Sequence, residues 1–368
     1  MKFYEHKAHE IFRKYGIPVP RGVLAAKPED LAEPPLPCVV KAQVLIGGRG
    51  KAGGIKTAKT VEEARAAAQE ILGMSIGPYT VRQVYAQELL DITRELYLSV
   101  TIDRSARAPL LMASALGGVD IESVPREKIV RIHIAPLIGL QPYVLRNLAK
   151  RLALPQEVAT QVSDIAKKMY ALFRGEDAEL VEINPLAVLR DGRVVAGDAK
   201  LIVDDSAEYR HPEYADLPQD RTPLEEEAHD KGITFIQLDG DIGVIANGAG
   251  LTMATLDVLN LKGGRGGAFL DLGGTDDPEK VKQAFEILLK ARPSVIFLNI
   301  FGGITKADTV ALGVEQALRA FGSNVPVVAR IKGVNEERAR AILANAGMRS
   351  VETVEHGAEL AVQLRGEH

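Results

Sequence analysis

The sequence predicts a protein of mixed α/β and α+β class with two domains, one over residues 1–225 and one over residues 226–368. The chain has 368 residues, more than a usual single domain. A polar segment with prolines and an acidic run, residues 206–228, separates two parts of different character. Beyond it, apolar strands alternate with amphipathic helices from about Ile242, a pattern typical of a parallel sheet covered on both faces.

The composition excludes several classes of protein. With 46% hydrophobic residues, 26% charged residues and a net charge of -4, nothing indicates a nucleic acid or a membrane surface as partner. The single cysteine, Cys38, excludes an intrachain disulfide and a cysteine-based zinc site. No apolar run reaches the roughly 18 residues of a membrane span, and the first residues lack the apolar core of a signal peptide. We therefore expect a soluble, cytoplasmic protein, although a mitochondrial matrix would suit this composition equally well.

Hydrophobic periodicity predicts the elements of the N-terminal part in order. Apolar residues at helical spacing predict a helix over 4–15 that ends at Gly16, with His6 and His9 on its surface beside Lys7. Alternating or β-branched runs predict strands over 38–45, 55–60, 81–90, 94–103 and 108–115. Helices are predicted over 61–72 and, as two stretches, within 141–174.

The stretch Gly47–Gly54, GGRGKAGG, contains the dinucleotide pattern G-x-G-x-x-G. That fingerprint requires a helix directly after the glycines, whereas residues 55–60 read IKTAKT and predict a strand. It is not a Walker A loop either, because Ala52 follows the lysine in place of Ser or Thr. The remaining interpretation is a loop between two strands that lays backbone N–H groups over a polyphosphate, with Lys41 adding a charge. A mobile basic hairpin is the alternative.

A second pattern predicts a hairpin over residues 179–203, turning at Asp191-Gly192. With a three-residue loop Asn184 faces Asp198 directly, and with a two-residue turn the pair is diagonal. Glu182 shares the face of Asn184. Carboxylate and amide oxygens suit Mg²⁺ that completes its shell with phosphates and water. A solvated hairpin face is the alternative.

The C-terminal part places small residues where strands end. Residues 247–250 follow the first strand and residues 301–305 follow the third, so both offer backbone N–H groups near a helix N-terminus. Such a position suits a carboxylate or a phosphate, although glycine turns are also ordinary connectors. None of the seven histidines has metal spacing or the surroundings of a catalytic triad, so a covalent nucleophile would belong to another chain.

Several motifs together resemble one family. The segments VVKAQVLIGGRGKAGGIK, DITRELYLSVTIDR, LVEINPLAV with DAKL, NGAGLTMATLD and LNIFGGIT are similar to the β subunits of succinyl-CoA synthetase (succinate–CoA ligase). The resemblance runs in order along nearly the whole chain. It implies an N-terminal ATP-grasp domain of two lobes and a C-terminal flavodoxin-like domain with a doubly wound parallel sheet, as in the acyl-CoA synthetases that form nucleoside diphosphates.

The resemblance also implies an activity and a partner. The family reaction converts nucleoside triphosphate, succinate and CoA reversibly to diphosphate, phosphate and succinyl-CoA, the substrate-level phosphorylation of the citric acid cycle. It uses Mg²⁺ and a phosphohistidine carried by a partner α subunit, in a heterodimer or a heterotetramer. The choice between ATP and GTP stays open.

The resemblance assigns roles to particular residues. Glu182 would hold the partner's phosphohistidine while it faces the nucleotide, and Asn184 and Asp198 would bind Mg²⁺. The phosphates would contact Lys41, Gly48, Arg49 and Gly50; the nucleotide pocket would include Gln87, Leu90 and Glu95; and the carboxylate substrate would bind at Asn247, Gly303, Ile304 and Thr305.

One departure concerns the base pocket. The chain reads Ala86-Gln87-Glu88 where some members of the family have a glutamate at the hinge position. Three alternatives stay open: the β subunit of a malate–CoA ligase, an NAD-dependent oxidoreductase, and a non-catalytic binding or scaffold subunit.

Overall fold

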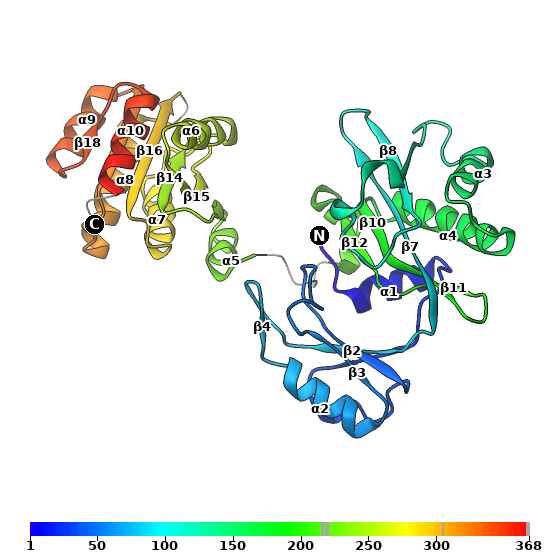
Figure 1. Ribbon diagram of the computed structural model, residues 1–368. Helices are drawn as coiled ribbons and strands as arrows, with labels where there is room; N and C mark the ends of the chain where they lie inside the picture. Colours follow the sequence, from blue (N-terminus) through cyan, green and yellow to red (C-terminus); the bar gives the residue numbers. More distant parts are fainter. Residues whose placement is uncertain (215–216, 218–220, 304, 366–368) are drawn as a thin grey trace. The chain divides into compact units, whose positions relative to one another are not determined.

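The computed structural model describes residues 1–214, 217, 221–303 and 305–365, and the chain forms two compact units, Met1–Asp220 and Arg221–His368 (Figure 1). The boundary predicted between residues 225 and 226 falls inside helix α5 (Pro223–Asp230), whose N-terminus is closed by a capping box between Thr222 and Glu225. The expected linker is therefore not uniformly irregular. It also contains two short 3₁₀ helices, Asp205–Arg210 and Pro212–Tyr214.

The first unit holds a small antiparallel sheet covered by one helix. The strands run in the order β1-β6-β2-β3, and α2 (Val61–Ile71) lies against this sheet (Figure 1). The buried alanines of α2 share one apolar core with the strands. Their bounds are β1 Gly22–Ala25, β2 Cys38–Ala42, β3 Ile55–Ala58 and β6 Val84–Glu88, and a two-stranded hairpin, β4 Ser75–Ile76 with β5 Tyr79–Thr80, follows α2. The glycine stretch 47–54 therefore connects two antiparallel neighbours, β2 and β3.

A larger antiparallel sheet forms the rest of the first unit. Its order is β11-β10-β7-β8-β9, with β12 pairing the same edge of β10 as β11 does. The strands are β7 Ile92–Asp103, β8 Ala108–Ser114, β9 Ile129–His133, β10 Ala178–Leu189, β11 Val194–Ala196 and β12 Lys200–Val203. Helices α1 (Glu5–Lys14), α3 (Pro142–Arg151) and α4 (Gln156–Gly175) contribute apolar side chains to the same core as this sheet.

The hairpin register confirms the three-residue loop. Leu186 pairs with Ala196 and Glu182 pairs with Lys200, so one continuous register places Asn184 opposite Asp198. The ladder itself is interrupted between β11 and β12, where the N–H of Gly197 bonds the carbonyl oxygen of Pro185 at 2.9 Å. Residues 197–199, between β11 and β12, therefore do not belong to a regular strand.

The second unit is a doubly wound sheet with one strand that the sequence analysis did not predict. Strands β15, β14, β16, β17 and β18 are parallel, which confirms the predicted parallel sheet, and β13 joins β15 antiparallel at the edge. The bounds are β13 Thr234–Gln237, β14 Ile242–Ala246, β15 Gly266–Asp271, β16 Val295–Gly302, β17 Val327–Gly333 and β18 Arg349–Ser350. The four residues of β13 are too short to show a strand pattern by themselves.

Helices cover both faces of this sheet. Side chains of α7 (Pro278–Lys290), α8 (Ala307–Phe321) and α9 (Glu336–Asn345) share one apolar core with the sheet. Those of α6 (Ala249–Leu261) and α10 (Val354–Arg365) share a second core on the other face. In the described part of the chain, no helix has the length and apolar character needed to cross a bilayer.

Candidate nucleotide and metal site

A cavity of about 660 Å³ in the first unit is lined by segments that are far apart in the sequence. The glycine loop forms one wall, and the interrupted hairpin and the loop after β8 form others. The sequence-predicted residues on its lining are Gly48, Arg49, Gly50, Glu95, Glu182, Asn184 and Asp198. The fold therefore gathers most of the residues predicted for the N-terminal part, of both the phosphate-loop and the metal-binding type, around one space.

The other predicted residues of this unit lie beside the cavity or apart from it. Lys41 and Gln87 are buried, and both donate to the carbonyl oxygen of Gly197, each at 3.0 Å. Leu90 instead lines a separate cavity of about 420 Å³ together with Arg21 and Glu88. The structure thus joins Lys41 and Gln87 to the hairpin interruption, and it does not bring Leu90 to the main cavity.

The glycine loop is a closed turn between strands. Gly48 has a φ of 78°, in the region that side chains rarely adopt, and its carbonyl oxygen accepts from the N–H of Ala52 at 3.2 Å. At Gly54 a Cβ would lie 2.7 Å from Ile76 Cδ1, 3.1 Å from Ala42 Cβ and 3.2 Å from the carbonyl oxygen of Arg49, so any other residue there requires its neighbours to shift. No helix follows, which removes the structural basis for dinucleotide binding here.

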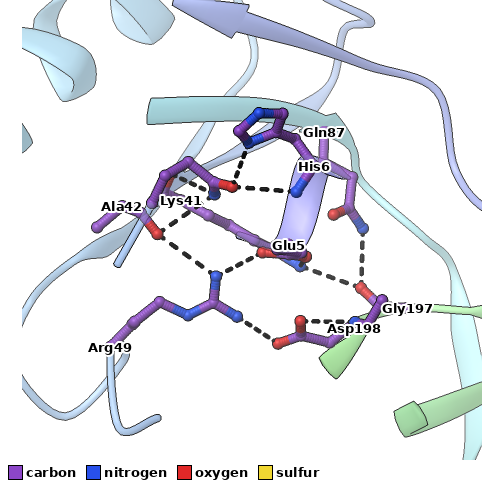
Figure 2. Close-up of polar contacts among 10 residues, drawn as sticks. Glu5, His6, Lys41, Ala42, Arg49, Gln87, Gly197 and Asp198 are labelled. Atoms are coloured by element: carbon purple, nitrogen blue, oxygen red, sulfur yellow. Dashed lines mark hydrogen bonds and ion pairs between the residues drawn. The ribbon is translucent and has the colours of Figure 1, made fainter. Parts of the chain in front are cut away.

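A chain of ion pairs joins α1, β2, the glycine loop and the hairpin (Figure 2). Glu5 accepts from Lys41 Nζ at 2.6 Å and from Arg49 Nη1 at 2.5 Å. Arg49 Nη2 in turn donates to Asp198 Oδ2 at 2.6 Å. Burial favours the neutral acid, but Lys41 and Arg49 outweigh it and lower the pKa of Glu5. Burial likewise opposes the charge of Arg49, and the carboxylates of Asp198 and Glu5 raise its pKa instead.

Asn184 is held by the loop that follows β8. Its Oδ1 accepts from the N–H of Gly118 at 2.7 Å, and its Nδ2 donates to the carbonyl oxygen of Val119 at 2.8 Å. Asp120 of the same loop pairs with Lys51 of the glycine loop at 2.7 Å. The loop after β8 therefore contacts both the proposed metal ligand and the phosphate loop.

These donors fit a hard divalent cation. The register places the Asn184 amide opposite the Asp198 carboxylate, and Glu182 also lines the cavity, so three oxygen-bearing groups face one space. Asn184 Oδ1 keeps a second lone pair beside its bond to Gly118. Arg49 donates to Asp198 Oδ2 and the N–H of Ala199 donates to Oδ1, so a cation at Asp198 competes with the guanidinium for the same carboxylate.

A second group of possible metal ligands lies elsewhere in the first unit. Glu176, His211 and Glu213 bring one ligand atom each within 4.8 Å of one another. These are not the residues predicted to bind Mg²⁺, and Glu176 already accepts from the hydroxyl of Tyr214 at 2.5 Å. The set also shows that one histidine lies near carboxylates although the sequence spacing gave no indication of it.

Glu182 has a tyrosine partner that the sequence analysis missed. The hydroxyl of Tyr97, on the neighbouring strand β7, donates to Glu182 Oε2 at 2.8 Å. Burial raises the pKa of Tyr97, and the Glu182 carboxylate raises it further, so the hydroxyl keeps its proton and acts as a donor. Glu95 lies exposed at the cavity beside Gly118, where a Cβ would come within 2.0 Å of its carboxylate.

The predicted carboxylate site belongs to the second unit. Asn247 bridges the ends of the adjacent parallel strands β14 and β16, since its side chain donates to the carbonyl oxygen of Phe301 and accepts from its N–H at 2.8 and 2.9 Å. Thr305 is buried and donates to the carbonyl oxygen of Gly273 at 3.3 Å, whereas Gly303 is exposed. Ile304 lies outside the described residues. Asn247, Gly303 and Thr305 thus share one end of the sheet.

The prediction that His6 and His9 lie on the surface is wrong. Both are buried, because the face of α1 that includes them packs into the first unit. His6 Nδ1 lies 3.0 Å from Gln43 Oε1, and the ring nitrogens of His9 have no hydrogen-bond partner within the described ranges. The sequence analysis also did not single out Glu5, because it did not predict that this face of α1 is buried. The spacing of Glu5 from Ala8 and Phe12 on the apolar stripe was the available signal.

Comparisons with known proteins identify the families of both parts of the chain. Residues 2–188 match the ATP-grasp domain family, and residues 245–364 match the CoA-ligase family. The chain is 47% identical to the ADP-forming succinate–CoA ligase subunit β of Pyrobaculum calidifontis, with 99% of both chains covered. It is 45% identical to the subunit of the same name from Chloroflexus aurantiacus, with all of both chains covered.

The chain belongs to the succinate–CoA ligase β-subunit family. As a member of this family it is a ligase built from an ATP-grasp domain and a CoA-ligase domain, which confirms the resemblance seen in the sequence motifs.

The solved structures support the same fold over the full length. A chain of ATP citrate lyase from Methanothrix soehngenii superposes with a TM-score of 0.72 at 20% identity, covering 98% of this chain and 99% of that one. ATP citrate lyase from Methanosaeta concilii gives a TM-score of 0.71 at 17% identity, with the same coverage of both chains. At these identities the likeness concerns the fold alone. None of these relatives and structures favours a malate–CoA ligase or an oxidoreductase.

Proposed function

We propose that this chain is the nucleotide-binding β subunit of an ADP-forming succinate–CoA ligase, which catalyses the reversible conversion of ATP, succinate and CoA to ADP, phosphate and succinyl-CoA. The observation that carries the proposal is the cavity of the first unit. It collects the glycine loop with Arg49 and three oxygen-bearing groups, and the buried Lys41 lies beside it, paired with Glu5 of the lining; these are the parts that phosphoryl transfer requires. The choice of succinate as the acid and of ADP as the nucleotide product comes from the names of the full-length relatives.

In this proposal the polyphosphate lies under Gly48 and Gly50, with Lys41 and Arg49 as its cations. Asn184 and Asp198 would hold Mg²⁺, which neutralises charge on the transferred phosphoryl group when it is bound. Arg49 would leave Asp198 for the phosphates as the cation arrives. The side-chain oxygen of Gln87 is buried and lacks a partner among the described residues, so it offers an acceptor for an amino group such as that of adenine.

Glu182 would receive the partner's phosphohistidine by accepting a hydrogen bond from its imidazole. Tyr97, bonded to the same carboxylate, would keep it oriented. Asn247, Gly303, Ile304 and Thr305 would take the succinate carboxylate in the second unit. Because these residues lie in a different unit from Glu182, we propose that a histidine loop of the α subunit carries the phosphoryl group between the two sites. We place this activity in the cytoplasm, as a heterodimer or a heterotetramer.

The test is to co-express the chain with a candidate α subunit and to purify the complex. CoA-dependent nucleotide turnover is then measured with succinate and with malate, and with ATP and with GTP. We expect turnover with succinate and ATP. Turnover with malate alone would reassign the acid, turnover with GTP alone would reassign the nucleotide, and a folded complex inactive with both acids would contradict the ligase proposal.

Two substitutions in the same complex distinguish a catalytic subunit from a non-catalytic scaffold subunit. Asn184→Ala and Asp198→Ala remove the proposed magnesium ligands, and we expect each to reduce turnover by roughly 100-fold or more. Full activity in both variants would mean that this subunit binds its partners without taking part in the chemistry.

A further inference from the structure

The carboxylate of Glu5 lies between two cations that come from different elements. Glu5 is the first residue of α1, yet its side chain is only 2% exposed. One of its oxygens accepts from Lys41 on β2, and the other accepts from Arg49 in the glycine loop (Figure 2). Neither the sequence motifs nor the roles proposed above account for this carboxylate.

Glu5 is the acidic partner of Lys41 in this network. Lys41 is itself buried, and its other acceptor is the uncharged carbonyl oxygen of Gly197 at 3.0 Å. A buried ammonium group without a nearby anion tends to lose its charge or to move toward water. Glu5 therefore places a negative charge against the buried Lys41 ammonium and holds it beside the cavity.

Glu5 also fixes the guanidinium of Arg49. Arg49 spans Glu5 and Asp198 with two different nitrogens, so its second anchor is a residue proposed to bind Mg²⁺. When Asp198 turns to a cation, Glu5 is the carboxylate that continues to hold the loop arginine. A planar guanidinium held at one nitrogen still directs its remaining donors, which is a geometry suited to phosphate.

We propose that Glu5 is a positioning residue for the phosphate-binding cations, setting Lys41 and Arg49 in the orientation that receives the nucleotide polyphosphate. This inference rests on the proposed nucleotide site. Glu5 does not touch the nucleotide itself; it acts through the two cations. A buried ion network contributes little net stability once desolvation is counted, which makes a purely structural role a weaker explanation of why it is present.

The test compares Glu5→Gln with Glu10→Gln in the αβ complex. Glu10 lies on the same helix but is exposed and pairs with Lys7 at the surface, so it is a matched control. Dissociation constants of Mg-ADP are measured by titration calorimetry, and thermal melting checks the fold. We expect Glu5→Gln to weaken Mg-ADP binding about 10-fold or more and Glu10→Gln to leave it within about 2-fold.

A double-mutant cycle separates positioning from general weakening. If Glu5 acts through Lys41, Glu5→Gln has much less effect on Mg-ADP affinity in a Lys41→Met background than in the unaltered chain. Additive effects in both a Lys41→Met and an Arg49→Gln background overturn the proposal, and so does unchanged or tighter binding by Glu5→Gln. If Glu5→Gln does not fold, the folded Glu5→Asp variant decides, since a shorter carboxylate reaches both cations less well and must also weaken binding. Failure of the unaltered complex to bind Mg-ADP contradicts the nucleotide site itself.

Discussion

Arg49 and Asp198 form an ion pair at 2.6 Å that joins the glycine loop to the interruption of the hairpin. Arg49 belongs to the predicted phosphate loop, and Asp198 is a predicted metal ligand, so the two halves of the proposed site neutralise each other in this structure. A metal ion and a nucleotide must therefore compete with a contact inside the protein. Nucleotide phosphates would release Asp198 by drawing Arg49 away from it.

This pair predicts opposite effects on metal and nucleotide in Arg49→Gln. Without the guanidinium, Asp198 is freer to bind a cation, so Mn²⁺ binding to the nucleotide-free chain should tighten by roughly 3- to 10-fold. Mg-ADP binding should weaken by about 10-fold, because a phosphate contact is lost. Electron paramagnetic resonance of free Mn²⁺ measures the first effect, and titration calorimetry measures the second.

Lys51→Gln is the control for this prediction. Lys51 lies in the same loop and pairs with Asp120, which is not a proposed ligand. Mn²⁺ affinity in the nucleotide-free chain should be unchanged in this variant. Equal tightening in both variants would indicate a general charge effect and would contradict a specific competition at Asp198.

A second prediction concerns the hydrogen bond between Tyr97 and Glu182. Tyr97→Phe removes one donor from the carboxylate proposed to receive the phosphohistidine and leaves the packing of the ring nearly intact. Since hydrogen bonds to charged groups contribute about 1.5–3 kcal/mol, we expect phosphorylation of the α-subunit histidine to slow by about 10-fold. The KM for nucleotide should not change, because Tyr97 contacts Glu182 and does not line the cavity that is proposed to bind the nucleotide. Single-turnover phosphorylation with labelled ATP measures the rate.

Tyr170→Phe makes the same chemical change where no effect is expected. The hydroxyl of Tyr170 is buried and has no partner in the described part of the chain. Its removal should leave the rate unchanged and the stability equal or slightly higher. A similar loss of rate in both variants would show that Tyr97 acts on stability and not on Glu182.

Local sequence patterns predicted most of the fold, because most helices and strands are long enough to show their own hydrophobic periodicity. The hairpin is the clearest case, since the Asp191-Gly192 turn and two β-rich runs predicted it with two possible registers, and the structure has the one that places Asn184 opposite Asp198. The strand-helix alternation after Ile242 likewise predicted the parallel sheet. The edge strand β13 was not predicted, because it has four residues and derives its stability from pairing with β15.

Residues of the candidate site were predicted only where they lie within a recognisable sequence motif. Gly48, Arg49 and Asp198 were predicted from their sequence surroundings, and all three line the same cavity. Glu5 and Tyr97 were not found, because their importance comes from contacts with residues 36 and 85 positions away along the chain. An acidic residue in the first turn of a helix is normally a solvated residue that favours the helix dipole. Only the packing of α1 against the cavity shows that Glu5 is buried.

A third prediction follows from the burial of His9. Burial lowers the pKa of His9 to about 4, with Glu5 opposing the shift and Lys41, Arg13 and Arg49 adding to it. The imidazole is neutral in both the folded and the unfolded state above the unfolded pKa of about 6.5. As the pH falls from 6.5 toward 4, the unfolded chain binds a proton that the folded chain does not, so the first unit loses up to about 3 kcal/mol of stability.

His9→Leu tests this dependence. The variant should show a smaller fall in the urea midpoint of the first unit between about pH 7.5 and about pH 4.5 than the unaltered chain does. His229→Leu, at an exposed position of the second unit, should leave the midpoint of the first unit unchanged at both pH values. An identical slope in His9→Leu and the unaltered chain would mean that His9 is not buried as a neutral side chain.

The final prediction tests the conformation of the glycine loop by two matched substitutions. Gly48 has a φ of 78° and open space where an alanine methyl group would lie, so Gly48→Ala is opposed by the backbone alone, at about 1–2 kcal/mol. Gly50 has an ordinary φ, and a Cβ would lie 3.7 Å from Ile55 Cδ1, so Gly50→Ala should raise stability by about 0.4–1 kcal/mol. Calorimetric melting of the two variants should shift the transition of the first unit in opposite directions, by about 2–4 °C per kcal/mol. A lower melting temperature for Gly50→Ala than for Gly48→Ala would mean that the loop has a different backbone in solution. In that case the contact between Arg49 and Asp198 would lose its support, since the turn at Gly48 is what directs the next residue toward the hairpin.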